Sequence, residues 1–252
     1  MTTIDSDTLT QFAPDANALH DKVILITGAS DGIGKALAVQ AASFGATVIL
    51  LGRSEKKLSA VYDTIVESGG PTPVMLPLDF LKADGGVYLS IAEQIKADFG
   101  RLDGLVHCAG ILGEMTDIEE YDGTIWQQVM HVNTTAPFAL TKVCIPLLKT
   151  AKGSVVFASS SVGRKGRAFW GAYSVSKFAI EGLAQTLADE LSASDVRVNA
   201  VNPGGTRTNM RLQAYPAEDR TKLKTPDEVT PAFLYFLCDT VGGVTGQSVN
   251  AQ

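Results

Sequence analysis

Short apolar segments rich in β-branched residues alternate with longer segments of helical period along almost the whole chain of 252 residues. The apolar segments lack polar alternation, which is typical of strands buried on both faces of a parallel sheet. Helices that connect parallel strands also cover the two faces of their sheet. The alternation therefore predicts an α/β fold, a doubly wound parallel sheet of about seven strands with helices on both faces.

Both kinds of segment can be placed along the chain. The expected strands lie at residues 22–27, 46–51, 73–78, 102–109, 153–159, 196–201 and 247–250. The expected helices lie at residues 33–44, 55–68, 86–99, 117–131, 135–150 and 172–193. Because no internal repeat or low-complexity linker interrupts them, we expect a single Rossmann-type domain over residues 1–252, with residues 1–20 as an N-terminal extension. Ligands of such sheets bind beyond the carboxyl ends of the strands, so the irregular stretch 203–225 is the expected substrate loop.

Charge and composition argue against several classes of protein. The formal net charge of −6 opposes binding to nucleic acids or to anionic membranes. The chain has no apolar run of about 18 residues and no basic start before an apolar run, so we expect neither a membrane span nor a secretory signal. Cys108, Cys144 and Cys238 show no CxxC or Cys/His spacing, which favours reduced thiols, a cytoplasmic location and no metal site.

A glycine-rich turn, TGASDGIGKALA at residues 27–38, follows the first expected strand and opens a helix. Its glycines, Gly28, Gly32 and Gly34, allow the backbone to approach a pyrophosphate closely, and the free N–H groups of the helix start favour the charge of that group. The spacing differs from the GxGxxG of the general dinucleotide fingerprint. A tight strand-to-helix turn without a ligand is the alternative.

Tyr173 and Lys177 lie four positions apart in an expected helix. The rise between them is about 6 Å, which places both side chains on one face. The pair is either a proton-transfer device or part of an amphipathic surface, on which the tyrosine packs inward and the lysine reaches water.

Several motifs together resemble the short-chain dehydrogenase/reductase family, and they occur in its order from residue 21 to residue 250. They are TGASDGIG, LDF with Asp79, HCAG at 107–110, HVN with Asn133, SSSVG at 159–163, YSVSK, and NPGGTRT at 202–208. The resemblance is nearest to a bacterial branch of oxidoreductases of unestablished substrate. It implies an enzyme that transfers a hydride between a nicotinamide cofactor and a carbonyl or secondary alcohol, and that forms a homodimer or homotetramer. A non-catalytic dinucleotide-binding sensor or a scaffold subunit is the alternative.

The resemblance implies four catalytic residues. Tyr173 is the general acid or base, and the Lys177 ammonium binds the nicotinamide ribose and lowers the pKa of the phenol below its usual value of about 10. Ser160, at the end of an expected strand, holds the substrate oxygen, or else its serine cluster satisfies backbone groups there. Asn133 kinks a helix and relays protons through water to the lysine, with a helix cap as the alternative.

The resemblance also implies contacts with the cofactor from several loops. Asp79 accepts a hydrogen bond from the adenine amino group or caps the following segment, and Thr208 contacts the nicotinamide carboxamide or is an exposed turn residue. The implied cofactor-binding residues are Gly28, Ser30, Asp31, Gly32, Ile33, Gly34, Arg53, Asp79, Ala109, Gly110, Tyr173, Lys177, Pro203, Gly204, Thr206 and Thr208.

The end of the second expected strand predicts a preference for NADP(H), with NAD(H) as the alternative. Gly52 stands where NAD-preferring relatives carry an aspartate, and Arg53 after it can bind a 2′-phosphate through paired hydrogen bonds. Lys56 and Lys57 follow closely. Against this, Asp31 stands where many NADP-using relatives carry a basic residue, so its charge opposes the phosphate. Arg53 could instead cap the strand end in solvent.

Other residues bear on the substrate and on departures from the family pattern. Cys108 replaces a customary asparagine, and we expect a buried core thiol there rather than a reactive one. Arg164, Lys165 and Arg167 either meet an anionic substrate or form a solvated or subunit-facing basic loop. The loops expected near the pocket carry apolar side chains, which predict an apolar body on the small-molecule substrate. These are Ile111, Leu112, Met115, Phe169, Trp170, Met210, Leu212 and Tyr215.

Overall fold

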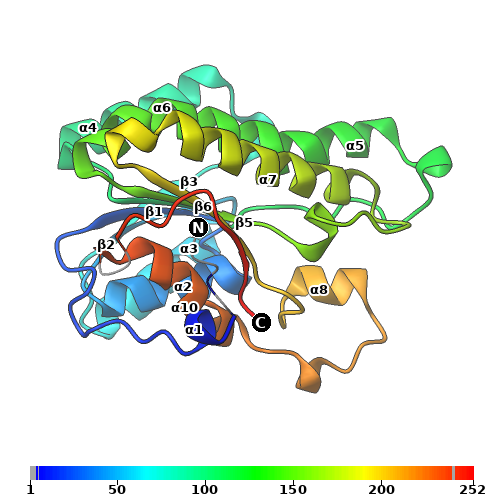
Figure 1. Cartoon of the computed structure of the whole chain (residues 1–252), viewed down its shortest axis with the longest axis horizontal. Coiled ribbons are helices and arrows are strands. Elements are labelled where there is room, and N and C mark those ends of the chain that lie inside the picture. Colours follow the sequence, from blue (N-terminus) through cyan, green and yellow to red (C-terminus); the bar gives the residue numbers. More distant parts are fainter. Residues whose placement is uncertain (1–3, 5, 240–241) are drawn as a thin grey trace.

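A seven-stranded sheet lies between two layers of helices (Figure 1). The computed structural model describes residues 4, 6–239 and 242–252, so residues 1–3 and 5 of the expected N-terminal extension lie outside the described residues. The strands are β1 (Val23–Thr27), β2 (Thr47–Gly52), β3 (Val74–Pro77), β4 (Gly104–His107), β5 (Ser154–Ala158), β6 (Arg197–Asn202) and β7 (Ser248–Asn250). Their spatial order is β3-β2-β1-β4-β5-β6-β7, and every neighbouring pair is parallel. The predicted doubly wound parallel sheet is confirmed.

Helices cover both faces of the sheet. Figure 1 shows α4 (Gly85–Phe99), α6 (Ala136–Ala151) and α7 (Gly171–Glu190) on one side, with α5 (Gly123–Met130) beside them. The other side carries α1 (Ser6–Thr10), α2 (Gly32–Ser43), α3 (Glu55–Glu67) and α10 (Pro231–Leu237). Two shorter helices, α8 (Asn209–Ala214) and α9 (Pro226–Val229), lie between β6 and α10 in the chain.

The two faces of the sheet form two separate cores, because successive strand residues point to opposite faces. In β1, Leu25 packs with α4, α6 and α7, whereas Ile24 and Ile26 pack with α2, α3 and α10. All five residues of β1 are buried, which explains why the strand has no polar alternation. Leu9 and Leu19, from the expected N-terminal extension, are also fully buried in the second core.

The structure corrects several expected boundaries. The helix expected at 117–131 is interrupted: a 3₁₀ turn at Ile118–Glu120 precedes α5, which begins after Asp122 because that carboxylate accepts from the first free N–H groups of the helix. Strand β4 is shorter than the expected 102–109, with loops beginning at both of its ends. The stretch 203–225 is not wholly irregular, since it contains α8.

Membrane-spanning helices and metal sites are two features that the described residues can reveal. None of their helices is both long and apolar enough to cross a membrane. They also contain no group of three or more histidine, cysteine, aspartate and glutamate side chains that could hold a metal ion.

Candidate active site

A cavity of about 470 Å³ lies beyond the carboxyl ends of β1, β2 and β4. Its walls come from the glycine-rich turn, the end of β2, the segment after β3, the loop after β4 and the start of α8. The predicted cofactor-binding residues that line it are Gly28, Ser30, Asp31, Gly32, Ile33, Gly34, Arg53, Asp79, Ala109, Gly110 and Thr208. The cavity thus gathers residues that are far apart in the chain, at the edge of the sheet where a doubly wound fold binds ligands.

The glycine-rich turn is too crowded for side chains. Gly28 has φ +70°, and a Cβ there would lie 2.8 Å from the Ala109 nitrogen. A Cβ on Gly34 would lie 2.4 Å from the Gly28 carbonyl oxygen, so the start of α2 packs directly on the turn. Ile33 and Gly34 line the cavity within the first turn of α2, where N–H groups have no intrahelical acceptor. This backbone cradle fits a pyrophosphate group.

Asp31 does not present an uncompensated charge to the cavity. Its Oδ2 lies 2.7 Å from Lys57 Nζ and accepts from Asn209 Nδ2 at 3.1 Å, while its Oδ1 accepts from the Gly32 N–H at 2.8 Å. The hydrogen bond from Lys57 is the main reason why the pKa of Asp31 is lowered. Arg53 lines the cavity, is exposed and forms no ion pair with any residue that the structure describes. The cavity wall therefore offers an unpaired guanidinium beside a carboxylate that Lys57 offsets.

Tyr173 and Lys177 lie on one face of α7, as the spacing predicts, and both are buried. The Lys177 ammonium lies 5.5 Å from the centroid of the Tyr173 ring and donates to the Ala158 carbonyl at 2.7 Å. The lysine is only 6% exposed, so it does not extend into water. Ser160, just after β5, lies close enough to the Tyr173 hydroxyl to influence its pKa. The structure therefore brings three of the predicted catalytic residues together.

Burial governs the protonation of this group. It raises the pKa of Tyr173 to about 12, and the nearby Ser160 opposes this only in part. It lowers the pKa of Lys177 to about 8, and Cys108 and Glu181 oppose this shift only in part. The predicted lowering of the Tyr173 pKa by Lys177 is not found, because desolvation of the phenolate outweighs the other effects and the ammonium is bound to the Ala158 carbonyl.

Asn133 lies in a π-helical turn, His131–Thr135, between α5 and α6. Its side chain accepts from the Ile111 N–H at 2.8 Å and donates to the Ile111 carbonyl at 2.9 Å and to Ser176 Oγ at 3.1 Å. The predicted helix irregularity is present, and the alternative role as a helix cap is not. The asparagine joins the cavity loop after β4 to α7, and its proton relay stays a prediction.

The four predicted catalytic residues adjoin the cavity without lining it. Tyr173 belongs to a small apolar cluster with Leu112, Val162 and Trp170, against which Met210 packs. Leu112 and Met210 also line the cavity, so the cluster connects the tyrosine to it. Of the other side chains expected near the substrate, Ile111 lines the cavity and packs against a sheet core, Met115 and Tyr215 pack against the cluster, and Phe169 and Leu212 are exposed.

Hydrogen bonds to the last residue of the chain and to the end of β6 hold the loop after β6. Gln252 Nε2 donates to the Pro203 carbonyl at 2.6 Å, and the Gly204 N–H donates to Asn202 Oδ1 at 3.0 Å. Pro203, Gly204 and Thr206 do not line the cavity, whereas Thr208 lines it and caps α8 by accepting from the Arg211 N–H.

Two alternatives from the sequence are realised. Asp79 caps the short 3₁₀ turn Phe80–Lys82 through the Leu81 N–H at 3.1 Å, while it also lines the cavity. Cys108 is only partly buried: it packs against a sheet core and also lines the cavity, while burial raises the pKa of its thiol to about 12, which agrees with an unreactive thiol.

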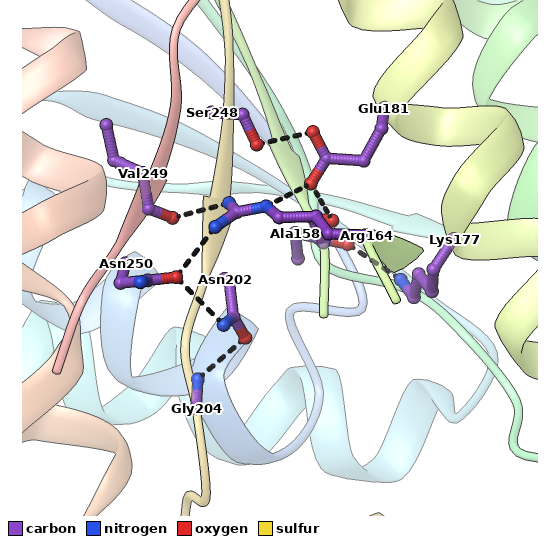
Figure 2. Close-up of polar contacts among 10 residues, drawn as sticks. Ala158, Arg164, Lys177, Glu181, Asn202, Gly204, Ser248, Val249 and Asn250 are labelled. Carbon is purple, nitrogen blue, oxygen red and sulfur yellow. Dashed lines mark hydrogen bonds and ion pairs between the residues drawn. The ribbon is translucent and has the colours of Figure 1, made fainter. Parts of the chain in front are cut away.

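Arg164 is not free to meet an anionic substrate. Its guanidinium pairs with Glu181 at 3.0 Å and donates to the Val249 carbonyl and to Asn250 Oδ1 (Figure 2). Arg167 donates to the Tyr215 hydroxyl at 2.7 Å. No local motif marks Glu181 in the sequence, because its partners lie on distant segments.

Comparison with known proteins places these features in a family. The family model for short chain dehydrogenase matches residues 22–219. YciK of Escherichia coli strain K12, an uncharacterized oxidoreductase, is 48% identical over 242 residues, which cover 96% of each chain. A crystal structure of a short chain dehydrogenase from Shigella flexneri 2a strain 301 complexed with NADP is 48% identical, with a TM-score of 0.92 over 94% of this chain and 100% of that one. Another, from Escherichia coli CFT073 complexed with NADPH, is 49% identical, with a TM-score of 0.92 over 95% of this chain and 100% of that one.

Proposed function

Because the chain belongs to the short-chain dehydrogenase family and is an oxidoreductase, we propose that it transfers a hydride between NADP(H) and a carbonyl or secondary alcohol, with Tyr173 as the general acid or base. The observation that carries this proposal is the group formed by the buried Tyr173 and Lys177 and the half-buried Ser160 beside a glycine-walled cavity. A sensor would need the cavity but not this group, and a scaffold subunit would need neither.

NADP(H) supplies the hydride that is exchanged with the substrate carbon. The N–H groups of the glycine-rich turn would hold its pyrophosphate, and Asp79 would accept from its adenine. Lys177 would bind the nicotinamide ribose, with Thr208 at the carboxamide. The loop Pro203–Thr206 would support the nicotinamide end from behind the cavity wall.

The proposed preference for NADP(H) rests on Arg53. Arg53 lines the cavity, and its guanidinium has no carboxylate partner among the described residues, so it can bind a 2′-phosphate. The negative charge of Asp31 does not oppose the binding of a 2′-phosphate, because the Lys57 ammonium offsets it. The relatives solved with NADP and NADPH support the same cofactor.

Tyr173 would donate its proton to the substrate oxygen during reduction. With a pKa of about 12 the phenol holds its proton at neutral pH, which is the form a general acid requires. Ser160 would hold the same oxygen by a hydrogen bond. Asn133 would keep the loop after β4 in register with α7 through its bonds to Ile111 and Ser176. The apolar cluster around Tyr173 supports a substrate with an apolar body.

A homodimer or homotetramer in the cytoplasm remains part of the proposal. Phe138 on α6 and both Val175 and Phe178 on α7 are large apolar side chains that are more than two-fifths exposed. Such side chains on neighbouring outer helices support pairing with a second copy. The three cysteines are free thiols, which agrees with a reducing compartment.

The test is turnover by the purified protein with NADPH and a panel of aldehydes and ketones that have apolar bodies, followed by NADPH absorbance. We expect carbonyl-dependent oxidation of NADPH with at least one member of the panel. Binding of NADPH without turnover of any carbonyl or alcohol would favour the sensor instead.

A further inference from the structure

Glu181 is a buried carboxylate on α7 that binds groups from three other segments (Figure 2). Its Oε1 accepts from Ser159 Oγ and, at 3.0 Å, from Arg164 Nε. Its Oε2 accepts from Ser248 Oγ at the start of β7. One side chain thus joins the end of β5, the loop after it, the tyrosine helix and the last strand.

Arg164 extends these contacts to the loop after β6. Its Nη2 donates to the Val249 carbonyl at 2.8 Å, and its Nη1 donates to Asn250 Oδ1 at 2.7 Å. Asn250 Oδ1 also accepts from Asn202 Nδ2 at 3.0 Å, and Asn202 in turn binds the Gly204 N–H. Figure 2 shows this continuous path from α7 to Gly204.

The network is attached directly to the proposed catalytic group. Ser159 is the neighbour of Ser160, and the carbonyl before it, that of Ala158, binds the Lys177 ammonium at 2.7 Å. Glu181 follows Lys177 by four positions, as Lys177 follows Tyr173, so the three side chains lie along one face of α7. A shift of the Glu181 carboxylate would therefore move the strand end relative to the helix.

We propose that Glu181 and Arg164 are positioning residues, which hold Ser160 and Lys177 in their mutual arrangement and couple them to the Pro203–Gly205 loop. The inference rests on the proposed function, in which Lys177 and that loop support the cofactor. A buried ion pair contributes little net stability compared with an apolar pair of the same size, so three convergent charged and polar contacts point to placement rather than to stability.

Glu181 also acts on Lys177 through its charge. The titratable groups near Lys177 are Tyr173 and Glu181 on α7 and His107 and Cys108 at the end of β4. Burial lowers the pKa of Lys177, and Cys108 and then Glu181 raise it in part; of these four groups, Glu181 alone has a carboxylate. Without that charge, Lys177 would lose its proton at a lower pH.

The experiment is NADPH binding between pH 6 and pH 10 by the full chain, measured by fluorescence titration. For Glu181→Gln, we expect the pH at which affinity declines to fall by about half a unit or more. For Arg164→Met, we expect affinity to weaken by about tenfold at neutral pH, because the loop loses its support. Arg164→Lys should restore part of this loss, since an ammonium reaches fewer of the three acceptors than a guanidinium does.

Arg101→Met is the matched control. Arg101 also pairs with a buried carboxylate, that of Asp103, but at the opposite end of the sheet. We expect this control to lower the melting temperature and to leave NADPH affinity unchanged. If Glu181→Gln and Arg164→Met behave in the same way, with NADPH affinity and its pH dependence as in the wild type, the inference is wrong. Where Glu181→Gln does not fold, Asn250→Ala interrupts the same path beyond Arg164, and unchanged affinity in that variant would likewise overturn the coupling to the loop.

The outcomes also separate the two proposals. If the wild-type protein binds NADPH but turns over no carbonyl, the proposed function fails, and the binding titrations still decide the positioning inference. If the wild-type protein does not bind NADPH at any pH, both proposals are overturned.

Discussion

Two arginine–carboxylate pairs hold the sheet at its opposite ends. Arg101 pairs with Asp103 just before β4, and Asp103 also accepts from the Val23 N–H at 3.1 Å, so this pair fastens the amino ends of two strands. Arg164 pairs with Glu181 beyond β5, among side chains from the end of β5 and from β7. Both carboxylates are buried, and the chemistry of the pairs is the same.

The two pairs differ in the loops that lie beside them. Loops at the carboxyl ends of parallel strands meet the ligand, whereas loops at the amino ends face away from it. A similar ion pair can therefore affect the proposed reaction at one end of the sheet and only the stability of the fold at the other.

The sharpest way to test this comparison is to remove a reacting group at the carboxyl end. Tyr173→Phe deletes the hydroxyl that would donate the proton and leaves a ring of the same shape in the apolar cluster. We expect kcat to fall by about 10²-fold or more, with NADPH affinity nearly unchanged. Steady-state kinetics and fluorescence titration of both proteins measure the two effects. Full activity of the variant would remove Tyr173 from its proposed role.

The glycine-rich turn gives the next largest effect. In Gly34→Val, a side chain would start 2.4 Å from the Gly28 carbonyl oxygen, so helix and turn must separate. We expect NADPH affinity to fall by about 10²-fold, since several hydrogen bonds to the pyrophosphate would be lost together. Gly182→Val is the control, because a Cβ at that exposed position on α7 meets no atom within 4 Å. If NADPH titrations of wild type and Gly34→Val coincide, the turn is purely structural.

The choice of cofactor is a smaller effect at the same end of the sheet. Arg53→Ala should remove most of a preference for NADPH over NADH of about ten- to hundredfold and leave NADH affinity unchanged. Lys57→Ala should also weaken NADPH binding, because it exposes the phosphate to the charge of Asp31. Titrations of the wild type and both variants with each cofactor measure these preferences. Equal or tighter binding of NADH by the wild-type protein would contradict the assignment.

The sequence was sufficient to predict the fold because the strands that form it are buried on both faces. The run 23–27 is apolar without polar alternation, and that pattern indicates a parallel sheet with helices on both faces. The glycine-rich turn and the Tyr173–Lys177 spacing are also local patterns, since each lies within one turn or one helix. The same reasoning missed α1, α8, α9 and α10. For α9, Pro226 at the helix start and a capping box between Thr225 and Glu228 were available as signals.

Features that depend on distant segments could not be predicted in this way. Glu181 and Ser248 are 67 positions apart, and Asp31 and Asn209 are 178 apart, so no spacing marks either contact. The pKa of Tyr173 is another case. The nearby lysine in the sequence suggests a lowered pKa, but the raised value follows from burial, which is set by the whole fold.

Removing the pair at the amino end should have the smallest effect on catalysis. Arg101→Met leaves Asp103 buried with the Val23 N–H as a remaining donor, so we expect a loss of about 1–2 kcal/mol in the free energy of unfolding, because Arg101 itself is half-exposed. For a chain of this size, each kcal/mol lowers the melting temperature by about 2–4 °C. Thermal unfolding and steady-state kinetics on the same preparation should show a lower melting temperature with kcat and NADPH affinity unchanged. A loss of NADPH affinity comparable to that of Arg164→Met would mean that an ion pair at either end of the sheet influences the site, and the contrast between the two pairs would not hold.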